Sequence, residues 1–286
     1  MAHPDWSGER EIVLEAVTKT YGDEFDAKTV VSECSFALEK GKFTVLIGPS
    51  GCGKTTLINL IAGYERPTAG KITFEGKEIA GPTRDRLVVF QETALFPWMT
   101  IFQNVMYGPS VQQGRPDAKE EAMALLAKVG LQDFHDKYPN QLSGGMQRRA
   151  ELARALINKP RVLLMDEPLR GLDAMTRQLM QEYILKLFEG SGQTILFVTT
   201  EIDEAILLAD NMILLSSSPA SAKELIRVDL PRPRTEAVFD TPRYAELKSH
   251  ILSILYGEAL QAFASGSRAA ADLIEAFEAR RKTGAE

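Results

Sequence analysis

Residues 43–63 read Phe43-Thr-Val-Leu-Ile47, then Gly48-Pro-Ser-Gly-Cys-Gly-Lys54-Thr55, then Thr56-Leu-Ile-Asn-Leu-Ile-Ala62-Gly63. The middle part matches the pattern G-x-x-x-x-G-K-[ST] at every position. The apolar run before it predicts a short buried strand, and Thr55–Ala62 predicts a helix that ends at Gly63. A strand, a glycine-rich loop and a helix in this order predict an α/β core that binds phosphate at the loop, rather than a chance glycine-rich turn.

The chemistry of such a loop assigns a role to most of its residues. Backbone N–H groups from Ser50 to Thr56 surround a β-phosphate, and Lys54 reaches the β and γ oxygens. Thr55 offers its hydroxyl to Mg²⁺. Cys52 is interpreted as a small loop residue, not as a nucleophile. The predicted nucleotide-binding residues are Gly48, Pro49, Ser50, Gly51, Cys52, Gly53, Lys54, Thr55 and Thr56.

A second glycine-rich helix start follows at Leu142-Ser-Gly-Gly-Met-Gln147. Ser143 is a favourable N-cap, and the adjacent Gly144 and Gly145 allow a close backbone approach to a ligand. The helix predicted over residues 146–157 directs its positive dipole end toward that serine. The chain therefore carries two places suited to bind an anion.

Two acids stand at the end of another apolar run, Arg161-Val-Leu-Leu-Met165, followed by Asp166-Glu167-Pro168. Ligands of open α/β sheets bind at the carboxyl ends of the strands. Asp166 can hold Mg²⁺ through a water, and Glu167 can orient or deprotonate an attacking water. The alternative is an acidic N-cap for the segment after Pro168.

The remaining pattern predicts an α/β fold with a helical insertion. Continuous apolar runs at 161–165 and 194–198 are typical of a sheet covered on both faces, and the composition changes at Leu230–Arg234. Further strands are expected at 11–17, 31–38, 71–74 and 86–90, helices between 97 and 157 (one at 118–129), and helices at 175–188, 244–263 and 269–281.

Composition excludes several classes of protein. The 286 residues are 44% hydrophobic and 25% charged, with a net charge of −6, which argues against a general nucleic-acid binder. Only two cysteines are present, so a reducing cytosol is expected. The N-terminus does not resemble a signal peptide, and no apolar run is long enough to cross a membrane.

At this point the sequence resembles the ATPase subunit of an ABC transporter over residues 10–235. The run Leu142–Gln147, with Ser143, Gly144, Gly145 and Gln147, is similar to the signature of that family. The resemblance implies that Tyr21 stacks on adenine, that Gln91 senses Mg²⁺ and the γ-phosphate, and that Asp173 communicates across a dimer. In isolation, each of these three would be assigned to a surface or a turn.

The family resemblance also implies the architecture. It consists of a phosphate-loop NTPase core with an N-terminal antiparallel β subdomain, an inserted helical subdomain at about 92–157, and a helical C-terminal extension. The ATP-binding domain is expected over residues 1–235 and the extension over residues 236–286.

The resemblance further implies that two subunits dimerise head to tail, each ATP lying between one phosphate loop and the partner's signature helix. Loss of the γ-phosphate would then unlink the halves. Separate transmembrane permease subunits and an extracytoplasmic solute-binding protein are expected, with this subunit peripheral at the cytoplasmic face of the inner membrane. The segment Ala94–Thr100, with Trp98, could form a groove for a permease helix or belong to the local core.

Three segments, Leu95–Trp98, Ile202–Ala205 and Val228–Arg234, look like the nitrate, sulfonate, taurine and bicarbonate group of importers. The expected activity is Mg·ATP hydrolysis that powers the import of a small anion. The solute itself is not encoded in an ATPase subunit, and neither homodimer nor heterodimer is specified.

The chain departs from the family at two positions. Thr200 stands where the family usually has a histidine on the γ-phosphate, and threonine cannot become cationic. ATP hydrolysis is therefore expected to be slower with Thr200 than with a histidine at this position, but not absent. Arg170 stands where a small residue is common, and could make a salt bridge across the dimer or be solvated.

Two alternative functions can be compared with the same residues. Non-transport members of the superfamily, acting in DNA repair or on ribosomes, usually have a coiled-coil insertion or two cassettes, and neither pattern is present. A nucleotide-gated scaffold with weak hydrolysis has Thr200 as its only support. In the tail, apolar faces at Ile251–Leu255 and Leu273–Phe277 favour packing on the parent domain over a regulatory or dimer-clasping role.

Overall fold

The strand before the phosphate loop, β3 (Phe43–Ile47), lies inside a six-stranded sheet with the order β10-β9-β3-β8-β7-β6. The structure is a computed structural model that describes residues 8–23, 26–112, 115–189 and 191–266. All neighbours in this sheet are parallel except β10, which pairs antiparallel with β9. Its other strands are β6 (Arg86–Val89), β7 (Val162–Asp166), β8 (Thr194–Thr199), β9 (Asn211–Leu215) and β10 (Ala222–Arg227).

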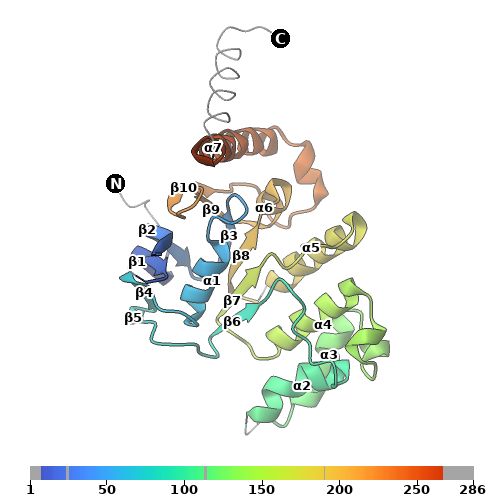
Figure 1. Ribbon diagram of the computed structural model, residues 1–286. Helices are drawn as coiled ribbons and strands as arrows, with labels where there is room; N and C mark the ends of the chain where they lie inside the picture. The colour runs from blue at the N-terminus through green and yellow to red at the C-terminus, as the bar shows by residue number, and fades with distance from the viewer. Residues whose placement is uncertain (1–7, 24–25, 113–114, 190, 267–286) are drawn as a thin grey trace.

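A second, antiparallel sheet has the order β2-β1-β4-β5 and lies at the N-terminal side of the molecule (Figure 1). Between the two sheets runs α1 (Lys54–Ala62), whose apolar residues share one core with both of them. The predicted antiparallel β subdomain is confirmed. Its strands are β1 (Arg10–Tyr21), β2 (Lys28–Glu39), β4 (Ala69–Phe74) and β5 (Lys77–Glu78).

Both faces of the six-stranded sheet are buried, as the continuous apolar runs predict. In β8, Ile195 and Phe197 face the core shared with α5 (Ala174–Phe188) and α6 (Ile202–Leu208), whereas Leu196 and Val198 face the core shared with α1. Strand side chains alternate between faces. An apolar residue is therefore needed at every position, which removes the alternation that marks a half-exposed strand.

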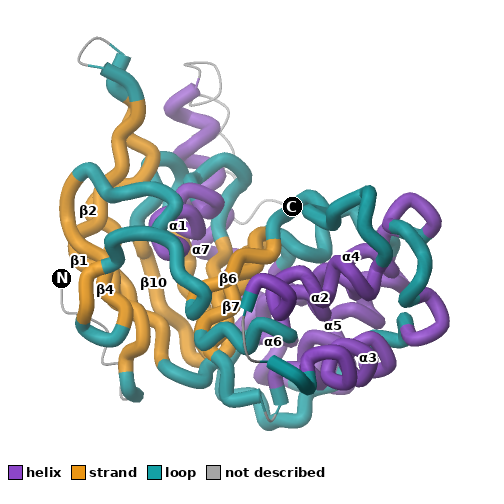
Figure 2. Tube along the Cα trace, turned by 90° about the horizontal axis from the view of Figure 1, so that it is seen from below, coloured by secondary structure: helices purple, strands orange, loops and turns teal. Residues whose placement is uncertain are grey.

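The inserted helices form a third core of their own (Figure 2). They are α2 (Ile101–Val111), α3 (Ala118–Lys128) and α4 (Gly144–Leu156), with 3₁₀ turns η1 (Gln132–Phe134) and η2 (Pro139–Gln141) between α3 and α4. Ile101, Ala122 and Ala150, one from each α-helix, are completely buried there. The insertion is thus a lobe with its own core, joined to the sheet core through Leu152 and Ala155 of α4.

The end of the described chain packs against the sheet domain. After η3 (Glu236–Asp240), α7 (Pro242–Gly266) buries Leu247 and Ile251 in the core that α6 shares. Asp203 of α6 lies 2.7 Å from Lys248 of α7. The helix predicted over 269–281, with Leu273, Ile274 and Phe277, lies outside the described residues. Within the described ranges, no helix combines the length and apolarity required to cross a bilayer.

The composition break at Leu230–Arg234 is a packed segment in the structure. Arg234 is only 5% exposed. Its guanidinium donates hydrogen bonds to the backbone oxygens of Val228, Leu230, Ile206, Leu207 and Ala209. Burial of this cation, with Arg232 nearby, lowers the pKa of Arg234 to about 10.

Replacing Arg234 with alanine is expected to lower the free energy of unfolding by about 3 kcal/mol, because buried carbonyl groups lose their donors. Urea denaturation measures this loss. Arg243→Ala is the control, because Arg243 makes only exposed ion pairs with Asp229 and Glu246 and should cost at most about 1 kcal/mol. Equal losses in the two variants would show that the buried network does not stabilise the fold.

Candidate nucleotide-binding site

The phosphate loop connects β3 to α1, as the sequence predicts, with the helix starting at Lys54 and ending at Gly63. Gly53 is the N-cap, with φ of 118°, a backbone conformation that side chains other than glycine rarely adopt. The Lys54 ammonium is 5% exposed and donates to the carbonyl oxygens of Gly48 and Pro49, each at 3.0 Å. The Lys54 side chain therefore folds back onto the backbone at the start of its own loop.

Cys52 of the same loop is 1% exposed, and burial raises the pKa of its thiol. A buried thiol with a raised pKa is a poor nucleophile. The structural role predicted for this residue agrees with that environment.

The two acids at the end of β7 lie beside the loop. Asp166 is 5% exposed, and its pKa is raised mainly by burial, against the opposing effect of a hydrogen bond from Thr55. Glu167 has a positive φ of 43°, and its Oε1 lies 3.8 Å from the Lys54 Nζ. The carboxyl end of β7 thus places Glu167 at the cationic end of Lys54.

The residues present fit a magnesium ion. The Thr55 hydroxyl and the Asp166 carboxylate are hard oxygen donors in direct contact, which suit Mg²⁺. No cluster of three or more His, Cys, Asp or Glu side chains that could hold a metal occurs in the described part of the chain. A metal here would therefore draw further ligands from phosphate oxygens and water.

Tyr21 lies at the end of β1, next to the loop. Its hydroxyl donates to Glu65 Oε2 at 2.6 Å and also hydrogen-bonds Thr56. Burial, followed by the contact with Glu65, raises the pKa of Tyr21. Tyr21 is 38% exposed, and the Lys19 ammonium lies over its ring, 4.9 Å from the centroid. Its stacking on adenine stays a prediction.

The signature run begins α4, and Ser143 is its N-cap as predicted, accepting from the Met146 N–H at 3.4 Å. Gly144 is exposed. Gly145 is buried, and a Cβ there would lie 2.5 Å from Thr176 Cγ2, so its missing side chain permits helix packing. The Gln147 amide donates to the carbonyl oxygens of Pro139 and Leu142, which holds the turn before the helix.

The phosphate loop and the signature run do not meet within one chain. They lie in different lobes (Figures 1 and 2), and no hydrogen bond or ion pair of the described residues joins 143–147 to 48–56. The two predicted anion sites are therefore separate in the monomer.

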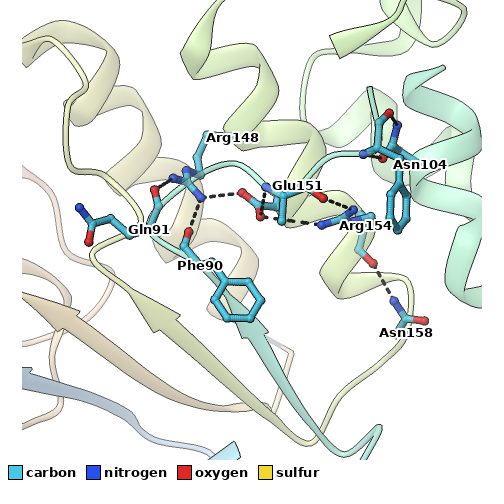
Figure 3. A network of polar contacts seen from close by, with 9 residues as sticks. Phe90, Gln91, Asn104, Arg148, Glu151, Arg154 and Asn158 are labelled. Atoms are coloured by element: carbon cyan, nitrogen blue, oxygen red, sulfur yellow. Dashed lines mark hydrogen bonds and ion pairs between the residues drawn. The ribbon is translucent and has the colours of Figure 1, made fainter. Parts of the chain in front are cut away.

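A buried network of hydrogen bonds and an ion pair connects α4, the helix that begins at the signature run, to the backbone of Phe90 and Gln91 (Figure 3). Arg148 of α4 donates to the carbonyl oxygens of Phe90, at 2.7 Å, and Gln91, and pairs with Glu151 at 2.5 Å. Glu151 in turn accepts from the Ala94 N–H. The exposed Gln91 side chain extends away from Arg148 (Figure 3). The sequence analysis did not identify Arg148 or Glu151, although a charged pair on the apolar face of a helix was a usable signal.

Asp173 caps α5, accepting from the Thr176 N–H at 3.0 Å and from its hydroxyl at 2.6 Å. These hydrogen bonds lower the pKa of Asp173. Within one chain Asp173 is thus a helix cap, and its role across a dimer stays a prediction.

Thr200 follows β8 and is exposed. Together with Glu167, Arg170 and Thr199 it lines a small cavity of about 40 Å³. Glu204, also in this lining, is buried, which raises its pKa, and it accepts from Gln181 at 3.0 Å. Arg170 pairs with Glu167 of its own chain at 2.8 Å, an arrangement that the sequence analysis did not anticipate.

Comparisons with known proteins identify the family of the chain. A model of the ABC transporter family matches residues 31–170. The ABC transporter ATP-binding protein MJ0412 of Methanocaldococcus jannaschii is 42% identical over 255 residues, covering 88% of this chain and 93% of the relative.

Two further relatives have named cargoes. The bicarbonate transport ATP-binding protein CmpD of Synechococcus elongatus is 38% identical, covering 86% of this chain and 90% of the relative. The taurine import ATP-binding protein TauB of Jannaschia sp. is 41% identical, covering 79% of this chain and 86% of the relative.

Among solved structures, the dimeric post-hydrolysis state of the ATP-binding cassette MJ0796, bound to ADP and Pi, is similar with a TM-score of 0.68 and 29% identity. The match covers 77% of this chain and all of that cassette. The chain belongs to the ATP-binding, ATP-hydrolysing subunits of the ABC transporter family.

Proposed function

We propose that this chain hydrolyses Mg·ATP in a head-to-tail dimer and thereby powers import of a small solute through separate membrane subunits. The observation that carries the proposal is the separation of two incomplete halves. Lys54, Asp166 and Glu167 gather at the carboxyl ends of β3 and β7, whereas Ser143 starts a helix in the other lobe. In a head-to-tail dimer, the phosphate loop of each chain would face the signature helix of the other chain, and the two halves would form one site.

The chain's own residues then divide the chemistry. Thr55 and Asp166 would hold Mg²⁺, which neutralises charge on the phosphates when bound. Lys54 would bind the phosphates, Gln91 would contact the metal and the γ-phosphate, and Glu167 would accept a proton from the attacking water. Thr200 would donate a hydrogen bond toward the γ-phosphate. Tyr21 would stack on adenine, and the partner's signature residues would close the site.

The cargo proposed is a small organic or inorganic anion of the nitrate, sulfonate or taurine type. The bicarbonate and taurine relatives support this class. A permease and an extracytoplasmic solute-binding protein would complete the transporter, with this subunit peripheral at the cytoplasmic face. Reconstitution with the copurifying membrane subunits, followed by uptake of labelled bicarbonate, nitrate and taurine, tests the assignment. The assignment would be contradicted if none of the three anions were taken up in an ATP-dependent manner.

A groove between the sheet and the inserted lobe is the proposed permease contact. A cavity of about 360 Å³ is lined by Val88, Phe96, Tyr107 and Arg154 among others. The Phe96 ring is tilted against the Tyr107 ring with 4.7 Å between centroids, and its centroid lies 5.5 Å from that of Trp98. Trp98 is 69% exposed, so it does not belong to the local core. Exposed aromatic residues beside a groove are typical anchors for a partner helix.

Trp98→Ala is expected to weaken copurification with the permease about 30-fold, because an aromatic anchor contributes about 2 kcal/mol to an interface. The ATPase rate of the isolated subunit should change less than about two-fold, since Trp98 is remote from the phosphates. Tyr256→Ala removes another exposed aromatic ring, 42% exposed, from α7 and should not affect copurification. Retained permease binding by the Trp98 variant would place the contact elsewhere.

A further inference from the structure

Glu167 is held between two cations in the structure. Its Oε1 lies 3.8 Å from Lys54 Nζ, and its Oε2 accepts a hydrogen bond from Arg170 Nη1 at 2.8 Å. The Glu167 side chain is 11% exposed, whereas the Arg170 side chain is 60% exposed. One carboxylate oxygen is therefore anchored, and the other faces the phosphate loop.

The loop that carries Arg170 is fixed at both ends. Leu169 is 2% exposed and packs in the core between the sheet and α5, and Asp173 caps α5. The Arg170 N–H donates to the Glu167 carbonyl at 3.1 Å, so the two residues are joined by a backbone turn as well as by the ion pair. The guanidinium consequently approaches Glu167 from a defined direction, unlike a freely solvated arginine.

The same cavity contains Thr200, whose hydroxyl is neutral at every physiological pH. The cations that line this cavity are Arg170 and Arg177, and its acids are Glu167, Glu201 and Glu204. Arg177 donates to the Leu172 carbonyl at 3.2 Å, and its charge acts on Glu204. Arg170 is thus the lining cation with an ion pair to Glu167.

We propose that Arg170 is a positioning residue for ATP hydrolysis. Its guanidinium anchors Oε2 of Glu167 and leaves Oε1 facing the Lys54 ammonium. The γ-phosphate would bind beside this ammonium, and Oε1 would accept the proton of the attacking water there. It also supplies positive charge beside Thr200, which threonine cannot supply. This inference rests on the proposed role of Glu167 as the base, and it goes beyond that role by naming the group that orients it.

The test is steady-state hydrolysis by the full-length chain. Arg170→Gln is expected to lower kcat about 10-fold while KM and the Kd for ATP change less than about two-fold, because a lost orienting contact acts on the transition state. Arg170→Lys keeps the charge and should recover about a third of the rate or more. Arg243→Gln, which removes an exposed guanidinium from α7, is the matched control.

A double-mutant cycle with Thr200→His tests the charge. Histidine at 200 can carry a proton, so Arg170→Gln should cost less than about three-fold in that background. An unchanged or increased kcat in Arg170→Gln would overturn the proposal. The same loss in both backgrounds would overturn the part that concerns positive charge beside Thr200. A failure of the underlying function is distinguishable, because Glu167→Gln would then remain active.

Discussion

Glu167→Gln is expected to lower ATP turnover by about two to three orders of magnitude, the usual contribution of a positioned general base. The amide has nearly the same shape as the carboxylate but cannot accept the proton of the attacking water. Glu167 directly follows β7, and its Oε1 lies 3.8 Å from the Lys54 Nζ, so the substitution removes the carboxylate that faces this lysine without disturbing the core. Phosphate release under saturating ATP measures the loss.

Binding distinguishes a chemical from a structural defect in this variant. The Kd for ATP should stay within about three-fold of wild type, and the ATP-bound dimer should persist on gel filtration because its γ-phosphate is not removed. Glu224→Gln, which changes a surface carboxylate that pairs with His250, is the control. A turnover loss smaller than about five-fold would remove Glu167 from the role of base.

Ser143→Arg is expected to abolish turnover while ATP binding to the monomer stays nearly intact. The arginine projects from the exposed start of α4, where a partner's nucleotide would dock, and removes an N-cap that contributes about 1 kcal/mol to the helix. Among the described residues, no hydrogen bond or ion pair joins Ser143 to Lys54 or its loop. Thr100→Arg, which removes the N-cap of α2, controls for the loss of a cap.

Mixing two inactive variants gives a sharper test of the shared site. A dimer of one Ser143→Arg chain and one Lys54→Ala chain contains one intact site, because the phosphate loop comes from the first and the signature from the second. An equimolar mixture should therefore recover at most about a quarter of wild-type turnover if the sites act independently. Loss of monomer ATP binding in Ser143→Arg equal to that in Lys54→Ala would contradict the composite site.

Much of the fold could be predicted from the sequence because the patterns that indicate its strands and helices lie in adjacent residues. The apolar runs at 43–47 and 194–198 became central parallel strands, and Gly63 ends α1 as predicted. The ends of elements differ by one to four residues: β6 ends at Val89 instead of Phe90, and β1 continues to Tyr21 instead of ending at Val17. Helix and strand termini depend on the last hydrogen bond, which neighbouring side chains decide.

The positions of the main site residues could also be predicted from local patterns in the sequence. Asp166 and Glu167 follow a buried strand, and their position beside Lys54 follows from the parallel order of β3, β8 and β7. Trp98 could not be assigned from its apolar neighbours, because Leu95 is buried and Trp98 is exposed only three residues later. Which of two nearby apolar side chains faces solvent depends on how α2 and α4 pack.

By itself the sequence determined the phosphate loop, the strand acids and the signature helix start, because each is a short pattern whose chemistry lies in adjacent residues. Only the tertiary structure decided which groups from distant segments touch. It brought Arg148 to the carbonyl oxygen of Gln91, and Gly145 against Thr176. It also placed the Arg170 guanidinium on Glu167 instead of in solvent. Such contacts depend on loop geometry and packing over many residues, and no local pattern records them.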